Sequence, residues 1–347
     1  MIELVDKLEI NRVLSKEEFS QLIANRTDSL SEYLFAKARK VREKYYGKDV
    51  YLRGLIEFTN HCKNDCYYCG IRKSNLHVER YRLTKEQILE CCDTGYALDY
   101  RTFVLQGGED KYFTDTIMVD IIQSIKQKYP DCALTLSLGE KSYESYLAYY
   151  KAGADRYLLR HETANAIHYS QLHPEKLSSE KRKQCLSDLK AIGFQVGTGF
   201  MVGSPFQTPE NLAEDMLYIH QLQPQMVGIG PFIPHHQTPF ADKKSGSMEL
   251  TLFMIGLLRL MLPYSLLPST TSLGTINPKG REKGLLAGAN IIMPNLSPID
   301  VRSKYLLYDN KICISDDARH CRHCLERRVE SAGYRIVSAR GDCKNVE

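Results

Sequence analysis

From Val50 onward the chain alternates short apolar runs, which are typical of strands, with longer amphipathic stretches, which are typical of helices. The runs that predict strands lie at residues 51–59, 102–106, 133–138, 156–162, 195–202, 226–232, 265–271 and 289–293. Helix starts between them carry capping sequences, such as Thr84-Lys-Glu-Gln87 and Thr208-Pro-Glu. The pattern predicts eight strands with helices between them over residues 50–294.

Repeated strand–helix units favour a parallel sheet, and eight of them in about 250 residues fit a closed barrel. We therefore predict an α/β fold, a (β/α)8 TIM-type barrel, with a doubly wound open sheet as the alternative. Residues 1–49 are predicted to be a helical segment, because Ser15-Lys-Glu-Glu18 matches a capping box. Residues 295–347 would form a C-terminal extension that carries cysteines.

Composition and charge narrow the function classes. The 347 residues are 43% hydrophobic and 25% charged, as expected for a globular chain that can bury a core. The 46 basic and 42 acidic residues leave a net charge of +4, too small a surplus to predict nucleic-acid binding. Residues 252–262 form the longest apolar stretch, which is too short to span a membrane. The N-terminus lacks the pattern of a secretory signal, so we expect a cytoplasmic protein.

Eleven cysteines are unusual in such a chain, because a reducing cytosol does not favour disulfides. Six of them form two tight groups, Cys62-x3-Cys66-x2-Cys69 and Cys313-x7-Cys321-x2-Cys324. The other five, expected to be small buried hydrophobic residues, are Cys91, Cys92, Cys132, Cys185 and Cys343. Metal binding is therefore the leading explanation for the two groups.

The first group directly follows the first predicted strand, at the end of a barrel where active sites lie. A structural zinc site needs four ligands, and no second pair of cysteines lies near enough in the sequence to complete one. Three cysteines can instead hold a cubane iron–sulfur cluster at three of its irons, which leaves the fourth iron open. Cys62, Cys66 and Cys69 are therefore the candidate catalytic ligands, and a chance group in a turn is the alternative.

Polar side chains are also predicted inside the barrel, because residues two apart on a strand share a face. The set on the predicted third and fourth strands comprises Thr135, Ser137, Arg156, Arg160 and Glu162. A desolvated charge without a partner costs several kcal/mol, so these residues meet a ligand, pair as Arg160 with Glu162, or point outward between helices. Arg53 in the first strand adds another inward cation and suggests an anionic ligand.

These residues resemble those of a known superfamily. The spacing of Cys62, Cys66 and Cys69 after a first barrel strand resembles the signature of radical S-adenosylmethionine (SAM) enzymes, with Tyr68 as the aromatic residue before the last cysteine. The run of Gln106, Gly107, Gly108 and Glu109 resembles the motif that receives the methionine amino group. The resemblance implies a 4Fe-4S cluster on the three cysteines and SAM on its open iron.

A finer resemblance, to the HydE family of FeFe-hydrogenase maturases, extends along essentially the whole chain. The strand ends that carry it lie at residues 160–165, 226–235, 270–275 and 291–295. It implies further cofactor contacts from Ser137, Arg160, Glu162, Arg182 and Tyr305. Glu162 would hold the ribose or amino group and Arg182 the carboxylate, although a solvated basic helix start is the alternative for Arg182.

The same resemblance implies two further sites. A substrate or anion pocket inside the barrel would be lined by Arg53, Thr135, Arg156, Thr270, Thr271, Met293 and Tyr308. Cys313, Cys321 and Cys324 would hold a second iron–sulfur cluster, 2Fe-2S or 4Fe-4S, that is peripheral to the chemistry. The alternative for this second group is a structural zinc clip assisted by His320 or His323.

The activity that the resemblance implies is reductive cleavage of SAM to an adenosyl radical, which acts on an iron carbonyl–cyanide cysteinate complex during assembly of the FeFe-hydrogenase H-cluster. The implied partners are this small organometallic substrate, the tyrosine lyase and scaffold GTPase maturases, and an electron donor. One rival is a radical SAM enzyme that rearranges a small organic acid or inserts sulfur into it. The other is a non-catalytic iron–sulfur carrier or scaffold, which would need no SAM site.

Overall fold

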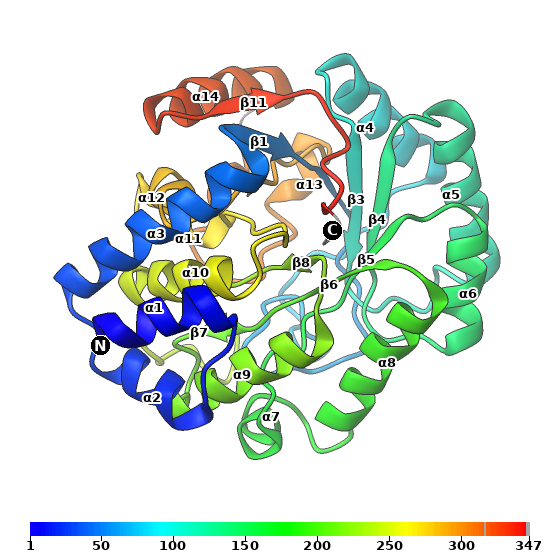
Figure 1. The fold of residues 1–347 in the computed structure, drawn as a ribbon. Helices are drawn as coiled ribbons and strands as arrows, with labels where there is room; N and C mark the ends of the chain where they lie inside the picture. The colour runs from blue at the N-terminus through cyan, green and yellow to red at the C-terminus, as the bar shows by residue number, and fades with distance from the viewer. Residues whose placement is uncertain (316, 345–347) are drawn as a thin grey trace.

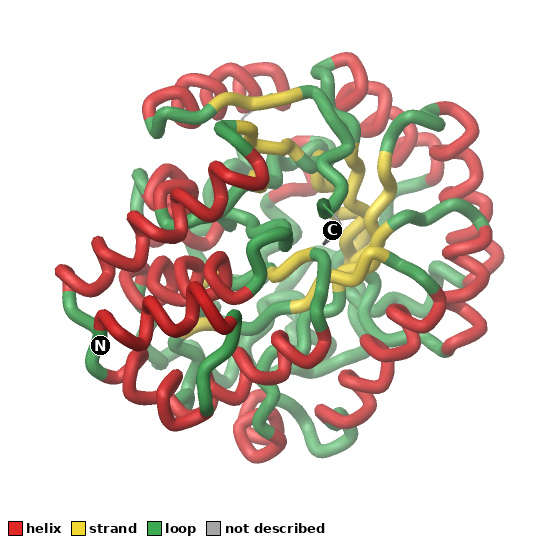
Figure 2. Tube along the Cα trace, viewed as in Figure 1, coloured by secondary structure: helices red, strands yellow, loops and turns green. Residues whose placement is uncertain are grey.

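The computed structural model describes residues 1–315 and 317–344. Its helices are α1 (Ile2–Asn11), α2 (Lys16–Ala24), α3 (Asp28–Tyr46), α4 (Lys85–Ala97), α5 (Asp115–Lys128), α6 (Tyr143–Lys151), α7 (Ala166–Leu172), α8 (Ser179–Ile192), α9 (Pro209–Leu222), α10 (Met248–Met261), α11 (Thr271–Ile276), α12 (Gly280–Leu286), α13 (Ile299–Arg302) and α14 (Ala318–Ser331). Its strands are β1 (Asp49–Leu52), β2 (Gly54–Thr59), β3 (Thr102–Gly107), β4 (Ala133–Ser137), β5 (Arg156–Leu158), β6 (Gln195–Thr198), β7 (Met201–Val202), β8 (Met226–Val227), β9 (Gly230–Pro231), β10 (Ile291–Ile292) and β11 (Arg335–Val337). The helices surround the strands (Figures 1 and 2).

The strands form a ring in which neighbours run parallel. Six of them lie in the order β2-β3-β4-β5-β6-β8, and β1 pairs with β10. Single bridges complete the ring, because Met226 of β8 pairs with Leu266, and Pro268 pairs with Ile291 of β10. The amide of Ile291 also donates to the Leu267 carbonyl at 3.2 Å. The predicted α/β barrel is confirmed, and the open-sheet alternative is wrong.

The predicted strand at residues 265–271 is wrong in its second half. Only Leu266 and Pro268 pair there, and Thr270 is the N-cap of α11. Proline has no N–H to donate to a ladder, which limits this part of the ring to single bridges. The predicted strand at 51–59 is also interrupted, at Arg53, between β1 and β2.

Two glycines divide the predicted strands at 195–202 and 226–232. The first is observed as two short strands, β6 and β7, and the second as β8 and β9. A Cβ on Gly199 would lie 1.9 Å from the carbonyl oxygen of Gly228, so the two backbones approach too closely for a regular ladder. The predicted strand at 156–162 pairs regularly only to Leu158, and Glu162 has a φ of 67°, in the left-handed region.

The N-terminal helices are confirmed, and they pack on the outside of the barrel. The amide of Glu18 donates to the Ser15 hydroxyl at 3.2 Å and the amide of Ser15 to the Glu18 carboxylate at 2.9 Å, as the capping box predicts. Arg12 donates to the Leu260 carbonyl at the end of α10 at 2.8 Å. The division of the chain at residues 49 and 294 stays a prediction.

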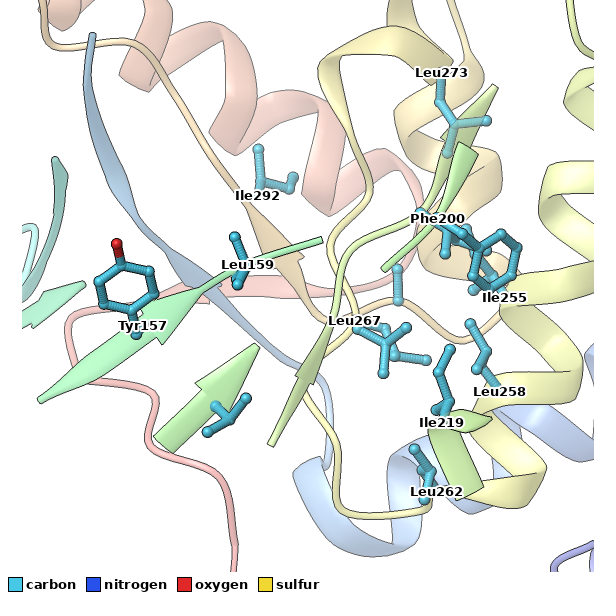
Figure 3. Close-up of a cluster of buried hydrophobic side chains, with 14 of the residues drawn as sticks. Tyr157, Leu159, Phe200, Ile219, Ile255, Leu258, Leu262, Leu267, Leu273 and Ile292 are labelled. Atoms are coloured by element: carbon cyan, nitrogen blue, oxygen red, sulfur yellow. The ribbon is translucent and has the colours of Figure 1, made fainter. Parts of the chain in front are cut away.

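Apolar side chains fill the space between the barrel and its helices. Figure 3 shows part of this core, with Leu267 and Ile292 from the barrel and Ile219 and Ile255 from α9 and α10. All four are fully buried. Burial of each such side chain contributes about 1.5–3 kcal/mol, which is the main force that holds the helices around the ring.

The C-terminal tail closes the N-terminal mouth of the barrel, a contact that the sequence did not predict. β11 pairs with β1, and the chain then runs into the centre of the ring (Figure 1). The Arg340 carbonyl accepts from Arg156 at 2.9 Å, and the Asp342 carboxylate lies 2.5 Å from the Arg156 guanidinium. Arg156 therefore meets a partner from its own chain at the start of β5.

No described helix is both long enough and apolar enough to cross a membrane, in agreement with the short apolar stretches of the sequence. Residue 316 and residues 345–347, which belong to the predicted C-terminal extension, lie outside the described residues.

The contact of the tail with the barrel leads to a stability prediction. Burial raises the pKa of Asp342, but the hydrogen bond from Arg340 and the charge of Arg156 outweigh it and hold the pKa below the usual value of 3.8. We expect Asp342→Asn to lower the free energy of unfolding by about 2 kcal/mol at neutral pH, because it leaves the buried Arg156 without its anion. Urea unfolding measures this.

The matched control is Asp120→Asn, which removes an exposed pair with Lys85 and should cost less than about 1 kcal/mol. Because the folded-state pKa of Asp342 is lowered, its contribution is present above about pH 4 and is lost as the pH falls further. Equal destabilisation by the two variants would contradict the proposed importance of the tail.

Candidate metal centre

The loop that carries Cys62, Cys66 and Cys69 leaves the C-terminal end of β2 and has no regular secondary structure. Two tight turns shape it, in which the amide of Cys69 donates to the Cys66 carbonyl at 3.4 Å and the amide of Arg72 to the Cys69 carbonyl at 3.1 Å. All three cysteines are free thiols of intermediate burial. The predicted place of this group, at the active-site end of the barrel, agrees with the structure.

Arg80 holds this loop together, a role that no sequence pattern indicated. Its guanidinium donates to four backbone carbonyls, at 2.5–3.1 Å, which belong to Asn60, Ile71, Arg72 and Asn75. These carbonyls lie on both sides of the three cysteines in the sequence. A single planar cation therefore fixes the start and the end of the loop relative to each other.

Two glycines allow neighbouring chain segments to approach the loop closely. A Cβ on Gly108 would lie 2.3 Å from the His61 carbonyl oxygen and 2.8 Å from the Cβ of Cys62. A Cβ on Gly70 would lie 2.2 Å from the Leu306 carbonyl oxygen. Backbone atoms cannot yield as a side chain can, so both positions require glycine. The loop is therefore packed between the end of β3 and the C-terminal extension.

The three thiols fit a multi-iron cluster better than a single ion. Burial, followed by the nearby Cys62, raises the pKa of Cys69 to about 12, and burial likewise raises the pKa of Cys66. Within residues 1–315 and 317–344, only His235, His236 and Asp309 bring three ligand atoms within 4.8 Å of one another, as a single ion requires. The three sulfur atoms of the loop do not all lie within this distance of one another, which suits an iron–sulfur cubane better than a single ion.

The group of two histidines and one aspartate forms a clamp between chain segments. The backbone amide of Gln237 donates to Nδ1 of His235 at 3.1 Å, which places the ring proton on Nε2 and leaves that atom no lone pair for a metal. His236 donates through its amide and its ring to the Asp309 carboxylate, at 2.8 and 2.7 Å. The clamp joins the loop after β9 to the C-terminal extension.

The end of β3 brings the predicted glycine motif beside the cysteine loop. Gln106 donates to the Tyr305 hydroxyl at 3.4 Å, so these two predicted cofactor residues lie together. Ser137 is the register partner of Gln106 on β4. The Glu109 carboxylate is buried and pairs with Lys63 of the cysteine loop at 3.0 Å.

Arg160 and Glu162 pair with each other at 3.2 Å, as one of the sequence alternatives expected. Behind them lies a fully buried pair that the sequence did not reveal. The Asp215 carboxylate accepts from Nε2 of His161 at 3.2 Å and from the amide of Ala164 at 2.5 Å. Asp215 thus fixes the residues on both sides of Glu162, whose left-handed backbone would otherwise be unfavourable.

Arg182 is buried, so the alternative of a solvated helix start is wrong, while its predicted contact with the cofactor stays a prediction. It pairs with Glu140 at 2.8 Å on the inner side of α8. Burial acts to lower the pKa of Arg182, but neighbouring acidic groups, Tyr169 and Glu140 foremost, raise it above its usual range. The signal in the sequence was the spacing of Arg182 to Cys185, which lie on one buried helical face.

Tyr68 is held by a neutral histidine. Burial lowers the pKa of His173 to about 3, and Nδ1 of its ring donates to the Tyr169 carbonyl at 2.9 Å. Its Nε2 is then free to accept from the Tyr68 hydroxyl at 3.1 Å. The aromatic residue of the cysteine loop is therefore anchored to α7 and the segment after it.

Only part of the predicted substrate pocket comes together. Arg53, Thr135 and Arg156 line one cavity of about 10 Å³ inside the barrel, which has room for roughly one water molecule. Two guanidinium nitrogens of Arg53 and the Thr135 hydroxyl have no hydrogen-bond partner there. Burial, then repulsion from Arg156, lowers the pKa of Arg53. This cavity lies next to the seal formed by the tail.

The other predicted pocket residues do not line this cavity. The Thr270 hydroxyl lies 3.0 Å from that of Ser272, and Arg281 donates to the Thr271 hydroxyl at 3.3 Å. Met293 packs against the apolar cluster of Met226, Leu266 and Ile291. Tyr308 lies in the C-terminal extension, where burial raises its pKa to about 12. Thr270 and Thr271 do not line the cavity because the strand that was to present them ends before them, and Thr270 is the N-cap of α11.

The second cysteine group joins a loop to a helix. The hydrogen bond between the Cys321 and Cys313 thiols, which stabilises the protonated form of Cys321, and then burial raise the pKa of Cys321. Cys321 lies in the first turn of α14, with Cys324 one turn further on. Arg281 donates to the Cys313 sulfur at 3.7 Å. His320 and His323 are exposed on α14. A buried ion pair between Lys311 and Glu57 of β2, at 2.6 Å, ties this region to the barrel.

The remaining cysteines agree with the prediction in four cases out of five. Cys91, Cys92, Cys132 and Cys185 are buried. Cys343 is only half-buried, because it lies in the C-terminal tail, where its thiol donates to the Tyr264 carbonyl at 3.0 Å.

Comparisons with known proteins agree with this geometry. Residues 56–219 match the model of the radical SAM superfamily. The chain is 44% identical over 344 residues to the FeFe-hydrogenase maturase subunit HydE of Thermotoga maritima, covering 99% of this chain and 98% of that protein. It is 29% identical over 297 residues to 3-methylornithine synthase of Methanosarcina acetivorans, covering 84% and 83%. A solved structure of methylornithine synthase (PylB) superimposes with a TM-score of 0.82 at 28% identity, covering 96% of this chain and 97% of that one.

The close packing at Gly108 leads to a test of the loop. Gly108→Ala forces the backbone near Cys62 to move. We therefore expect the affinity of the cysteine loop for iron to fall about tenfold or more in this variant. The control is Gly228→Ala, where the nearest atom to a new Cβ would lie 3.9 Å away and iron uptake should be unchanged. Anaerobic iron and sulfide titration followed by absorbance measures both, and equal uptake would contradict the packing argument.

Proposed function

Because this chain belongs to the radical SAM superfamily and, within it, to the family of the FeFe-hydrogenase maturase subunit HydE, we propose that it acts on an iron carbonyl–cyanide cysteinate complex during assembly of the H-cluster. The observation that carries this proposal is the combination of three free thiols at the active-site end of the barrel with 44% identity to HydE over 344 residues. When bound, the 4Fe-4S cluster and SAM supply a one-electron reductive cleavage that yields an adenosyl radical.

The residues of this chain would bind and orient the two groups. Cys62, Cys66 and Cys69 would hold the cluster, and Tyr68 would keep its loop in place through His173. The buried Arg182 offers a cation for the carboxylate of SAM, now balanced by Glu140. An arginine whose charge is retained under burial is well suited to a bidentate carboxylate contact.

Other predicted cofactor residues have roles that their positions support. The backbone from Gln106 to Glu109, with the buried Glu109 carboxylate, would receive the methionine amino group. Glu162, fixed by its pair with Arg160, would accept from the ribose or amino group. Tyr305 would pack on the adenosyl part, and Ser137 lies in register with Gln106 on the same inner face.

The charge inside the barrel supports an anionic substrate. Arg53 is a buried guanidinium with two unpaired nitrogens, and an unpaired buried cation is costly unless an anion meets it. Thr135 and Arg156 face the same cavity. We keep Thr270, Thr271, Met293 and Tyr308 as predicted pocket residues on the side toward the C-terminal extension. The tail that seals the opposite mouth would keep water from the reacting species.

The second cysteine group would hold an accessory iron–sulfur cluster. Cys313 and Cys321 lie within hydrogen-bonding distance, and Arg281 and Arg328 supply positive charge near the cysteines. The exposed His320 and His323 give no support to a zinc clip. Because this group lies in the C-terminal extension, on α14 and the loop before it, we assign it no part in the chemistry.

The proposed partners follow from the same family. They are the tyrosine lyase that makes the organometallic substrate, the scaffold GTPase, and an electron donor. A second candidate function, rearrangement of a small organic acid, is favoured by the likeness to 3-methylornithine synthase. The higher identity and longer coverage of HydE place the maturase proposal first.

Variants of the two cysteine groups test the division of labour. We expect Cys66→Ala to abolish the cleavage of SAM to methionine and deoxyadenosine, because the loop then has too few thiols for its cluster. Cys321→Ala, the matched control in the second group, should retain most of the cleavage. Anaerobic reconstitution and chromatographic product analysis measure both. Equal losses would refute the division, and no cleavage by the unaltered protein would favour a scaffold.

Deletion of the gene in its host tests the proposed substrate class. We expect the deletion to leave FeFe-hydrogenase polypeptide without hydrogen evolution, and a plasmid copy to restore it, because no H-cluster is completed without the maturase. Gas chromatography of hydrogen measures this. Full activity in the deletion strain would exclude the maturase function while leaving the SAM chemistry to be explained by the organic-acid candidate.

A further inference from the structure

A surface cavity of about 270 Å³ lies against the cysteine loop, and its walls are strongly basic. Five basic side chains line it, from Lys63, Lys73, Arg80, Arg82 and Lys111. Cys62 lines it too, and it is the one cysteine of the loop that does so. The cavity therefore reaches the candidate cluster from outside the barrel.

The positive charge of this cavity is only partly balanced. Two carboxylates line it, and they pair with Lys63 and Arg82, at 3.0 and 2.7 Å. Five basic minus two acidic groups leave an excess of three positive charges here, against +4 for the whole chain. Among the ion pairs of the described residues, none includes Lys73, Lys111 or Arg80, and the first two are exposed. Lys73 and Lys111 therefore face solvent, Arg80 binds backbone carbonyls, and none of the three forms an ion pair among the described residues.

An exposed aromatic side chain flanks the same cations, and an exposed leucine lies close to one of them in the sequence. Tyr112 directly follows Lys111, is 56% exposed, and lies 4.8 Å from the Arg82 guanidinium. Leu76 follows Lys73 by three residues and is 88% exposed. An aromatic ring among cations is typical of protein–protein contact surfaces, where it adds apolar area to electrostatic attraction. A small anion would need only the cations and not this apolar rim.

The place of the surface relates it to electron supply. The radical chemistry of the proposed function consumes one electron for each SAM that is cleaved, and the rate of electron transfer falls steeply with distance. On the opposite side the loop is packed against Leu306 and His235 at Gly70, which places protein between the thiols and solvent. At Cys62 the loop meets this surface, because the Cys62 side chain itself lines the open cavity.

We propose that the basic surface formed by Lys73, Arg80 and Lys111, with Tyr112 at its rim, is the docking site for an acidic one-electron carrier protein of the flavodoxin or ferredoxin class. This proposal rests on the proposed function, since only a redox-active cluster behind Cys62 gives such a carrier a purpose there. The carrier gives up one electron and the cluster accepts it, so no bond or proton need move. Steering by opposite charges would favour its encounter with this face.

The test uses a charge-reversal pair and a matched control. Lys73→Glu with Lys111→Glu changes the surface, and neither side chain belongs to the proposed cluster or SAM site. Lys40→Glu with Lys48→Glu makes the same change in charge at two exposed lysines of α3 and the segment before β1, which form no ion pair among the described residues. The probe is an acidic bacterial flavodoxin, oxidised for binding and as its hydroquinone for reduction.

We expect the Lys73/Lys111 pair to weaken flavodoxin binding about tenfold or more in titration calorimetry, and the Lys40/Lys48 pair to change it less than about twofold. Raising the salt from about 50 to about 300 mM should weaken binding to the unaltered protein and affect the Lys73/Lys111 variant little. In stopped flow, reduction by flavodoxin hydroquinone should slow in that variant, while reduction by dithionite should stay the same.

Three results would overturn the proposal. The first is that both charge-reversal pairs weaken flavodoxin binding equally. The second is that the Lys73/Lys111 variant is reduced more slowly by dithionite as well as by flavodoxin. The third is that this variant binds flavodoxin unchanged but no longer binds a single-stranded oligonucleotide, which would make the surface a nucleic-acid site. Failure of the proposed function looks different, because flavodoxin would still bind and reduce the protein but no SAM would be cleaved. The binding arm needs no catalytic turnover, so the two outcomes are read separately.

Discussion

Closure of the parallel strand ring is the constraint on which the rest of this structure depends. A parallel sheet leaves unpaired backbone groups at its edges unless its first and last strands meet. Here Tyr51 pairs with Ile291, and the single bridges at Leu266 and Pro268 span the weakest part of the ring. Because every strand points the same way, residues far apart in the sequence reach one rim. The cysteine loop, the glycine motif, Glu162 and Arg182 meet for that reason.

The two ends of the barrel are finished in opposite ways. At the N-terminal mouth the tail enters the ring, and Asp342 balances the buried charge of Arg156. At the other mouth the chain builds an irregular loop whose backbone carbonyls need donors, and Arg80 supplies them. The ion pair between Asp342 and Arg156 thus helps to close the N-terminal mouth. At the other mouth, the hydrogen bonds of Arg80 to backbone carbonyls stabilise the cysteine loop.

Charge is arranged differently on the two sides of the candidate cluster. On the inner side, the guanidinium groups of Arg53 and Arg182 are buried, which suits the anionic groups of a small molecule. Outside, Lys73 and Lys111 are exposed and gathered around Cys62, which suits an extended acidic surface. The cysteine loop separates a site for small molecules from a surface for a protein, so one redox group can serve both.

The sequence by itself determined the features that depend on near neighbours. Strand–helix periodicity predicted the barrel, the Ser15 capping box predicted α2, and the spacing of Cys62, Cys66 and Cys69 predicted a metal site within one short loop. Only the tertiary structure decided that Arg156 meets Asp342, that Arg182 is buried against Glu140, and that Asp215 supports the segment around Glu162. Arg182 and Glu140 lie 42 residues apart, and Arg156 and Asp342 lie 186 residues apart, so no local pattern links them. Their pairing follows from the closed ring, which brings distant charged groups out of water and makes each require a partner.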